Sequence, residues 1–206
     1  MAELNKDHWY DGWFYDKFIA PNQDRLFGKI KNLVNAESNI LDLGCGTGRF
    51  SFFIKDYCNS ILGIDLSKSN ISRANLTLSE NPSSKISFQH KSIRKIISEG
   101  KEHFDIAVMT YVIHEVNEED RENLLNEIAQ VADKIIIGDY IFPRPGGFWS
   151  GLNEVVEFAA GREHYRNFKS YLAGGGIPGI ANRGGFKVIK EIKNEPFTSH
   201  IVVLEK

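Results

Sequence analysis

Three glycines at alternating positions offer the clearest chemistry in this chain. An apolar run ends at Asp42, and Gly44, Gly46 and Gly48 follow it at every second position. Glycine has no Cβ, so it permits positive φ and lets a ligand approach the backbone closely. A parallel strand that ends in such a loop can deliver bare backbone to a nucleoside-like ligand.

A second acidic residue lies seventeen positions after Gly48. Asp65 ends another apolar run, and a carboxylate there can accept hydrogen bonds from both hydroxyls of a ribose. The alternative is a carboxylate at a helix N-terminus, where the helix dipole favours negative charge. In that case Ser67 is a further candidate for the N-cap.

Apolar runs and amphipathic segments alternate through the middle of the chain. The pattern predicts strands at 39–43, 60–64, 104–109 and 135–137, and an edge strand around Ile86 and Phe88. The intervening helices are predicted at 47–58, 67–79, 92–99 and 118–131. This alternation is typical of a parallel sheet with right-handed crossovers.

The N-terminal segment and the part of the chain from about residue 148 onward depart from this alternation. Residues 148–181 are rich in aromatic residues and glycine, and we expect two or three short helices there. Strands are predicted near 186–192 and 199–204, and their short link cannot carry a crossover, so they should form an antiparallel hairpin. The aromatic residues near the N-terminus favour a helical flap packed on the core.

The length of 206 residues is enough for one well-buried domain with a cap. We therefore expect a single domain over 1–206, with the N-terminal helical flap at about 1–38 and a helical insert at about 141–183. The oligomeric state is left open by the sequence, and a homodimer is only the commonest arrangement.

The amino-acid composition limits the partners, the cellular compartment and the metal sites that we expect. The formal net charge is -2 and basic residues do not cluster, so nucleic acid is not the expected partner. The apolar runs are too short to span a bilayer, and no signal-peptide pattern begins the chain. Cys45 and Cys58 are typical of a reduced, cytoplasmic protein. No Cys/His set has zinc-ligand spacing, so we expect no metal.

The glycine loop, Asp65, Phe104-Asp105 and the terminal hairpin together resemble the class I S-adenosylmethionine-dependent methyltransferases. The resemblance covers about 36–140 and the last twenty or so residues, and small-molecule enzymes of the quinone-biosynthesis type look most similar. It implies an α/β fold: a Rossmann-like, doubly wound sheet of seven strands, mostly parallel, with an antiparallel C-terminal hairpin. It also implies methyl transfer from S-adenosylmethionine to a small-molecule acceptor, at O or C, by in-line displacement.

The resemblance further implies a cofactor site at the ends of the predicted strands. Asp65 would hold the ribose hydroxyls, Leu66 would flank the adenine, and Ser92 stands where the family often has an acidic residue. The complete set of implied cofactor-binding residues is Tyr10, Tyr15, Asp42, Gly44, Cys45, Gly46, Gly48, Asp65, Leu66, Ser92, Ile93, Thr110 and Tyr111. For Tyr10 and Tyr15, core packing of a helix is the alternative.

Three residues are candidates for catalysis at the acceptor. His114 follows the strand at 104–109, and its ordinary pKa near neutrality suits a general base or an acceptor-orienting group. A structural role, anchoring its loop by hydrogen bonds, is the alternative. His164 and Tyr165 lie in the insert and could face the acceptor, or they could belong to an exposed helix face of mixed charge.

Two other functions use similar motifs. A nicotinamide-dependent oxidoreductase is one, although its usual G-x-G-x-x-G fingerprint differs from the spacing found here. A non-catalytic protein that binds S-adenosylmethionine is the other, and Ser92 gives it slight support. The segment 110–113 contains no proline, which argues against acceptors such as adenine nitrogens. The aromatic insert favours a small, partly aromatic or apolar acceptor.

Overall fold

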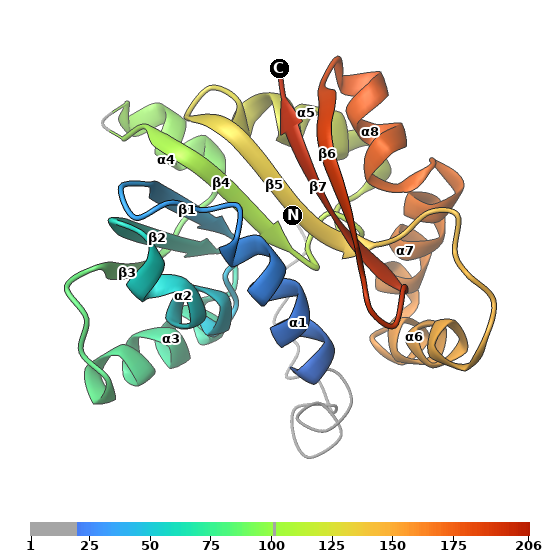
Figure 1. Ribbon diagram of the computed structural model, residues 1–206, viewed down its shortest axis with the longest axis horizontal. Coiled ribbons are helices and arrows are strands. Elements are labelled where there is room, and N and C mark those ends of the chain that lie inside the picture. Colours follow the sequence, from blue (N-terminus) through green and yellow to red (C-terminus); the bar gives the residue numbers. More distant parts are fainter. Residues whose placement is uncertain (1–19, 101) are drawn as a thin grey trace.

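A seven-stranded sheet forms the frame of the protein in the computed structural model, which describes residues 20–100 and 102–206. Its strand order is β3-β2-β1-β4-β5-β7-β6 (Figure 1). Neighbouring strands from β1 to β5 are parallel, and β7 is antiparallel to both β5 and β6. The strands are β1 Asn39–Leu43, β2 Ser60–Asp65, β3 Ile86–His90, β4 Phe104–Thr110, β5 Ala132–Tyr140, β6 Lys187–Asn194 and β7 Ser199–Glu205. The predicted mostly parallel sheet with its antiparallel hairpin is confirmed.

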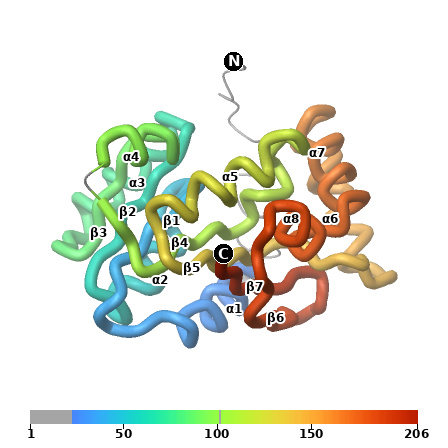
Figure 2. The backbone as a smooth tube through the Cα atoms, turned by 90° about the horizontal axis from the view of Figure 1, so that it is seen from above, coloured from blue at the N-terminus to red at the C-terminus, as the bar shows by residue number. Residues whose placement is uncertain are grey.

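Helices cover both faces of this sheet. Apolar side chains of α1, α2 and α3 fill the core on one face, and those of α4, α5, α7 and α8 fill the core on the other. Figure 2 shows α5 and α8 on the side of the sheet opposite to α1. The helices are α1 Ala20–Lys31, α2 Arg49–Ile54, α3 Lys68–Glu80, α4 Ile93–Glu99, α5 Arg121–Ile128, α6 Phe148–Ala159, α7 Arg162–Ala173 and α8 Gly176–Gly184, with short 3₁₀ turns at Lys55–Tyr57 and Glu118–Asp120.

The structure corrects several predicted boundaries. The helix expected at 47–58 is shorter, because Gly48 has a positive φ and the last turn is a 3₁₀ turn. Strand β5 is longer than 135–137, since its polar first residues obscured the apolar pattern. Of the expected flap, the described part is helical only over Ala20–Lys31, while 32–38 forms turns. Tyr10 and Tyr15 lie outside the described residues.

The ring of Phe88 occupies space that a side chain at Gly48 or at Gly63 would need. Phe88 on β3 is buried, and its ring lies where a Cβ on Gly48 or on Gly63 would have to be. Gly63 is in the middle of β2, where glycine weakens a strand unless something needs the space. The sheet accommodates the ring only because both neighbours lack a side chain.

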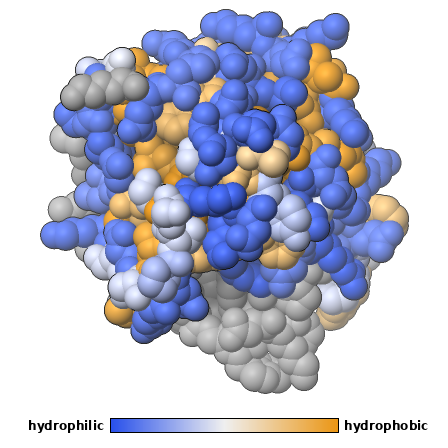
Figure 3. Space-filling model, turned by 60° about the vertical axis from the view of Figure 1, so that its left-hand side comes forward, coloured by the Kyte–Doolittle hydropathy of each residue, from blue (hydrophilic) through white to orange (hydrophobic). Residues whose placement is uncertain are grey.

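One face of the molecule is mostly polar (Figure 3). On the face shown in Figure 3, hydrophilic side chains predominate and hydrophobic ones are exposed in small areas between them. The most exposed large apolar side chains of the insert, Phe148, Val155 and Phe158, all lie on α6. Within residues 20–100 and 102–206, no helix combines the length and apolarity needed to cross a bilayer.

Candidate active site

The parallel strands end at one edge of the sheet, where ligands bind in open α/β folds. The sequence places most of the predicted cofactor residues at this edge, and we refer to them together as the cofactor edge. The cofactor edge consists of 42–48 at the end of β1 and beyond it, Asp65 and Leu66 at the end of β2, Ser92 and Ile93 after β3, and Thr110 and Tyr111 at the end of β4.

The glycine loop and Asp65 are in direct contact. The Gly46 N–H donates to Asp65 Oδ2 at 2.9 Å, and the Ser67 N–H donates to Oδ1 at 2.7 Å. Gly46 has φ +55, and nothing lies within 4 Å of the place where its Cβ would be. Bare backbone therefore faces open space beside a fixed carboxylate. Ser67 also caps α3, so Asp65 has a role at this helix N-terminus as well.

Asp42 is buried beneath this loop with one oxygen unpaired. Its side chain is 1% exposed, Ser51 Oγ donates to Oδ2 at 2.6 Å, and Oδ1 has no hydrogen-bond partner among the described residues. Burial, helped by the negative charge of Asp65, raises the pKa of Asp42 to about 7 against the opposing hydrogen bond from Ser51. An unpaired buried oxygen next to open backbone fits a ligand that carries cationic groups.

The other two glycines of the loop have packing roles. A Cβ on Gly44 would overlap the side chain of Val112, which belongs to the loop after β4. Gly48 makes room for Phe88, as described above. Cys45 is buried, and burial raises the pKa of its thiol. Only Gly46 of the three glycines is open to a ligand.

The remaining predicted cofactor residues take different positions. Leu66 is exposed and Ile93 is buried. Ser92 is the N-cap of α4, where its Oγ accepts a hydrogen bond from the Lys95 N–H at 3.3 Å. Thr110 ends β4, and Tyr111 adopts φ 56 and donates from its hydroxyl to Ser199 Oγ at 3.1 Å. The tyrosine hydroxyl is thus directed to β7.

A second group of polar side chains gathers next to the cofactor edge, and we call it the polar cluster. Its members come from the loop after β4, from the end of β5, and from α6 and α7: His114, Glu115, Asp139, Tyr140, Glu157 and His164. Val112, which contacts Gly44, lies two residues before His114, so the same loop borders both groups.

His114 is the centre of the polar cluster. Its ring is almost fully buried, with Nδ1 2.7 Å from Asp139 Oδ1 and Nε2 3.6 Å from Glu157 Oε2. Glu157 is buried too: its Oε1 accepts a hydrogen bond from the Tyr140 hydroxyl at 2.6 Å, and its Oε2 forms an ion pair with His164 Nε2 at 2.6 Å.

The charges of the polar cluster decide what His114 can do. Burial alone would lower the pKa of His114, but the carboxylates of Asp139 and Glu157 outweigh burial and raise the pKa to about 10. Burial would likewise raise the pKa of Glu157, and the two histidines hold it below its ordinary value. At neutral pH His114 is therefore an imidazolium, which favours the acceptor-orienting role over that of a base.

Tyr165 belongs to a different network. Its hydroxyl donates to Glu154 Oε1 at 2.7 Å, and Arg144 Nη1 donates to the other carboxylate oxygen at 2.8 Å. Its ring contacts Phe158 and Phe168. The structure therefore brings His114 and His164 together but directs the Tyr165 hydroxyl elsewhere. The aromatic residues of the insert are also divided, since Phe168 is in the core and Phe158 is exposed.

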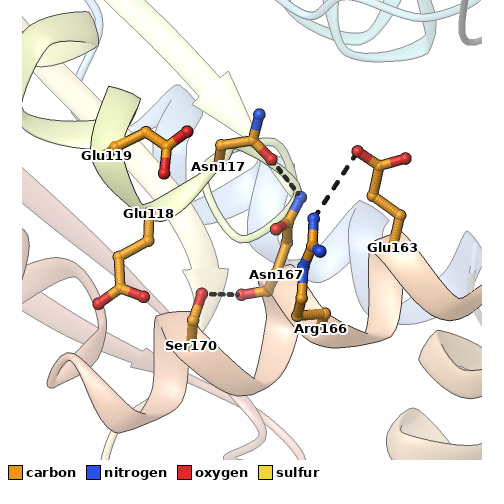
Figure 4. A pocket seen from close by; sticks show the side chains of 7 residues that line it. All are labelled: Asn117, Glu118, Glu119, Glu163, Arg166, Asn167 and Ser170. Atoms are coloured by element: carbon orange, nitrogen blue, oxygen red, sulfur yellow. Dashed lines mark hydrogen bonds and ion pairs between the residues drawn. The ribbon is translucent and has the colours of Figure 1, made fainter. Parts of the chain in front are cut away.

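Asn167 fixes the loop that carries His114 against α7. Its Nδ2 donates to the carbonyl of Glu115 at 2.8 Å and to Asn117 Oδ1 at 3.2 Å. Figure 4 shows Asn117 and Asn167 side by side at a polar depression of about 330 Å³, with Glu163 and Arg166 on the same helix. These bonds hold His114 and Glu115 opposite His164.

Four members of the polar cluster, Glu115, Asp139, Tyr140 and Glu157, are not among the predicted site residues, and two of these four are buried carboxylates. Asp139 follows the apolar run of β5, and Glu157 lies between Val156 and Phe158 on α6. A lone carboxylate within an apolar segment is a usable signal, because buried acids are rare unless they are paired. Neither residue stands in a motif, so only this contrast with their neighbours could have indicated them.

Known proteins match part of this sequence and share its fold. Residues 40–134 match a family model described as a methyltransferase domain. The O-antigen chain terminator bifunctional methyltransferase/kinase WbdD of Escherichia coli is 31% identical over 121 residues, which are 56% of this chain and 17% of WbdD. The chain thus spans about a sixth of the length of this curated relative.

Two solved structures are similar over nearly the whole chain. One is magnesium protoporphyrin IX methyltransferase (ChlM) from Synechocystis PCC 6803 with bound SAH, at 16% identity and a TM-score of 0.68, covering 97% of this chain and 93% of that one. The other is the N-methyltransferase NodS from Bradyrhizobium japonicum WM9 in complex with S-adenosyl-l-homocysteine, at 14% identity and a TM-score of 0.66, covering 99% and 94%.

Residues 40–134 therefore match a methyltransferase domain, and the chain shares its fold with two solved methyltransferases. These similarities support a methyltransferase and not a nicotinamide-dependent oxidoreductase.

Proposed function

We propose that this protein transfers a methyl group from S-adenosylmethionine to an oxygen or carbon atom of a small-molecule acceptor. The observation that carries the proposal is the open backbone at Gly46, hydrogen-bonded to Asp65, together with the unpaired buried oxygen of Asp42 in the preceding strand. Backbone, ribose-binding carboxylate and buried anion together match the chemistry of an adenosyl group joined to a cationic amino acid.

The cofactor edge supplies binding and orientation. S-adenosylmethionine brings an electrophilic methyl on a sulfonium, so the protein needs no covalent intermediate of its own. We assign Asp65 to the ribose hydroxyls and the Asp42 carboxylate to the positively charged end of the donor. The Gly46 backbone allows close approach, and alignment with exclusion of water provides the remaining rate enhancement.

The polar cluster is our proposed acceptor site. An acceptor hydroxyl beside the His114 imidazolium would lose its proton more easily, because the positive charge stabilises the oxyanion. His164 lies at the more exposed side of the cluster and would orient the same oxygen. Tyr165 has no part in this proposal, since its hydroxyl is bound to Glu154.

The proposal includes a cellular location, a class of acceptor and an oligomeric state. We propose a reducing, cytoplasmic location, supported by two free, buried cysteines. The formal net charge of -2 supports a small acceptor over nucleic acid, and ChlM, a similar fold, is named for a porphyrin acceptor. A homodimer is the oligomeric state we propose to test first.

Calorimetric titration with S-adenosylmethionine and with its demethylated product tests the cofactor edge. We expect Asp65→Ala to weaken binding by about 1–3 kcal/mol through the loss of charge-assisted hydrogen bonds. Asp133→Ala is the matched control, because this exposed aspartate pairs with His103 away from the site. Equal affinities of the two variants would refute the ribose assignment.

Turnover tests the rest of the proposal. Release of S-adenosylhomocysteine should be measured over a panel of phenols, enols and hydroxyquinones. Tight donor binding without turnover of any acceptor would favour the alternative of a non-catalytic S-adenosylmethionine-binding protein. Absence of binding by folded protein would remove the methyltransferase proposal altogether.

A further inference from the structure

We propose that the polar cluster binds one divalent transition-metal ion, held by His114, His164, Glu115 and Glu157. The inference rests on the proposed function in that the ion would face the acceptor, where it would take over the role that the His114 imidazolium has in the metal-free cluster. The four side chains come from the loop after β4, from α6 and from α7, so motif spacing along the chain cannot reveal them.

The donor atoms are arranged around a common point. One donor atom each of His114, Glu115 and His164 lies within 4.8 Å of the other two. Both histidine Nε2 atoms are 3.9 Å from Glu115 Oε1, and Glu157 Oε2 is 3.6 Å from His114 Nε2. Ligands about 2.1 Å from a tetrahedral metal are about 3.4 Å apart, so small shifts would suffice.

The side chain of Glu157 adds a second indication. It is 4% exposed, and its Oε2 lies 2.6 Å from His164 Nε2 and 3.6 Å from His114 Nε2. A metal between these atoms would take the place of the proton shared with His164 and widen the shorter gap. A buried carboxylate oxygen directed at two imidazoles has the chemistry of a metal ligand.

His114 is oriented in the way metal-binding histidines are. Asp139 holds Nδ1 at 2.7 Å, which leaves Nε2 directed toward Glu157 and Glu115. Ligating histidines almost always bond their other ring nitrogen to a carboxylate or carbonyl, because this fixes the ring and raises its basicity. Asp139 is itself fixed, since the backbone N–H groups of His114 and Tyr140 donate to it.

The charge of the cluster also suits a cation. Asp139 and Glu157 are buried carboxylates, and Glu115 adds a third with a more exposed side chain. Without a metal the histidines offset part of this charge, and a divalent ion bound to their neutral rings would offset it instead. Two histidines with carboxylates suit Zn²⁺, Co²⁺ or Fe²⁺ better than Mg²⁺ or Ca²⁺, which prefer oxygen ligands.

Such an ion would act on the acceptor hydroxyl. The hydroxyl oxygen would bind at the side of Glu115, whose side chain is 52% exposed. The O–H bond would break, the proton would leave to water, and the metal-bound oxygen anion would keep the electron pair that later attacks the methyl. No electron transfer is involved, and the ion stays divalent.

Calorimetric titration of the chelator-treated full chain with Zn²⁺ is the decisive experiment. We expect one ion per chain, bound at least about tenfold more weakly by Glu115→Gln and by His164→Gln. Glu115 is exposed, so its variant should fold normally. His103→Gln is the matched control, because it changes a histidine that pairs with Asp133 at the surface, and it should bind Zn²⁺ like the wild type.

Co²⁺ provides a second readout that does not depend on activity. Visible absorption bands of four-coordinate Co²⁺ should appear with the wild type and with His103→Gln, and should be lost with His164→Gln. Zn²⁺ affinity that is equal in all four proteins, or no binding to the folded wild type, would overturn the metal site.

Titration with S-adenosylmethionine in parallel separates the two proposals. Binding of S-adenosylmethionine without any specific Zn²⁺ binding would overturn only the metal site. Specific Zn²⁺ binding by a protein that ignores S-adenosylmethionine would support the metal site and overturn the proposed function.

Discussion

The cofactor edge and the polar cluster lie side by side but are built in opposite ways. At the cofactor edge, the Gly46 and Ser67 backbone N–H groups hold Asp65, and the space above Gly46 is open. In the polar cluster, side chains hold one another, as His114 holds Asp139 and Tyr140 holds Glu157, and three of the six are buried. The cofactor edge presents backbone to a ligand, whereas the polar cluster holds several charged side chains together.

This difference fits separate roles, with the methyl donor bound at the cofactor edge and the acceptor recognised by the polar cluster. A donor used in many reactions can be held by a strand–turn–helix whose shape depends on glycine, whatever side chains surround it. An acceptor is recognised by chemistry that must differ between enzymes, and in our proposal two of the six side chains of the polar cluster come from α6 and α7 of the insert. The predictions below test how far these two groups are independent.

The largest effect is expected where the polar cluster is most buried. Asp139→Asn removes the charge that faces the His114 imidazolium, and breaking a buried ion pair costs about 3–5 kcal/mol of unfolding free energy. Urea denaturation should show this loss. The control Asp133→Asn alters an exposed pair with His103 and should cost less than about 1 kcal/mol. Similar losses in both variants would contradict the buried charge pair.

An effect of nearly the same size should depend on pH at the cofactor edge. The pKa of Asp42 is about 7 in the fold and 3.8 when unperturbed, so the folded state binds this proton more tightly. Stability should therefore fall as pH rises from about 4 to about 7. Relative to the wild type, Asp42→Asn should gain about 4 kcal/mol between pH 4 and pH 8 in urea titrations.

Binding of S-adenosylmethionine should offset part of the loss of stability that the ionisation of Asp42 causes as pH rises. A cationic donor favours the ionised Asp42, so S-adenosylmethionine should bind more tightly as pH rises from about 5 to about 7. A pH-independent difference in stability between Asp42→Asn and the wild type would contradict the raised pKa.

A smaller loss is expected for Gly46→Ala. The residue has φ +55, and the left-handed conformation costs an alanine about 1–2 kcal/mol. Because no atom lies near the added methyl, the loss of stability should stay within this range, while donor binding weakens through the blocked approach. Gly28→Ala in α1 is the control, since its methyl is also free of contacts and its φ is not positive; thermal unfolding should show no loss.

The smallest effect is expected at Ser92. Its hydroxyl caps α4, so Ser92→Ala should cost about 1 kcal/mol, and Ser92→Asp should be nearly neutral because aspartate also caps. Differential scanning calorimetry measures both changes. If the serine only caps the helix, the affinity of Ser92→Ala for S-adenosylmethionine should equal that of the wild type. A clear loss of affinity would assign Ser92 to the cofactor site as well.

The two groups also differ in how well the sequence predicts them. The loop at Gly46 and its contact with Asp65 follow from local rules, because a strand end, a turn and a helix start are encoded within a few residues. Asp139 and Glu157 meet His114 only through the tertiary fold, and no local pattern encodes that meeting. Tyr165 shows the opposite case. Its residue type and its place next to His164 predict a role at the acceptor, but its hydroxyl donates to Glu154 instead.

Strand ends were predicted less well than strand existence, for a related reason. The core of β5 is an unbroken apolar run, but its first turn contains Asp133 and Lys134, whose polar side chains look like loop residues. Backbone pairing with β4 extends the strand through them, since Lys134 lies opposite Ile106. Hydrogen bonding between strands is decided by neighbours that a linear pattern does not contain.

The ring of Phe88 links three positions in a way that limits the order in which mutations can be tolerated. A side chain at residue 48 or 63 collides with this ring, and at residue 48 the φ of +84 strains a side chain as well. Phe88 therefore has to be replaced by a smaller residue before residue 63 can become larger, and that replacement alone opens a void in the core, which is also harmful. Homologues should therefore fall into two groups, one with an aromatic residue at 88 and glycine at 63, the other with a small residue at 88 and a bulkier one at 63.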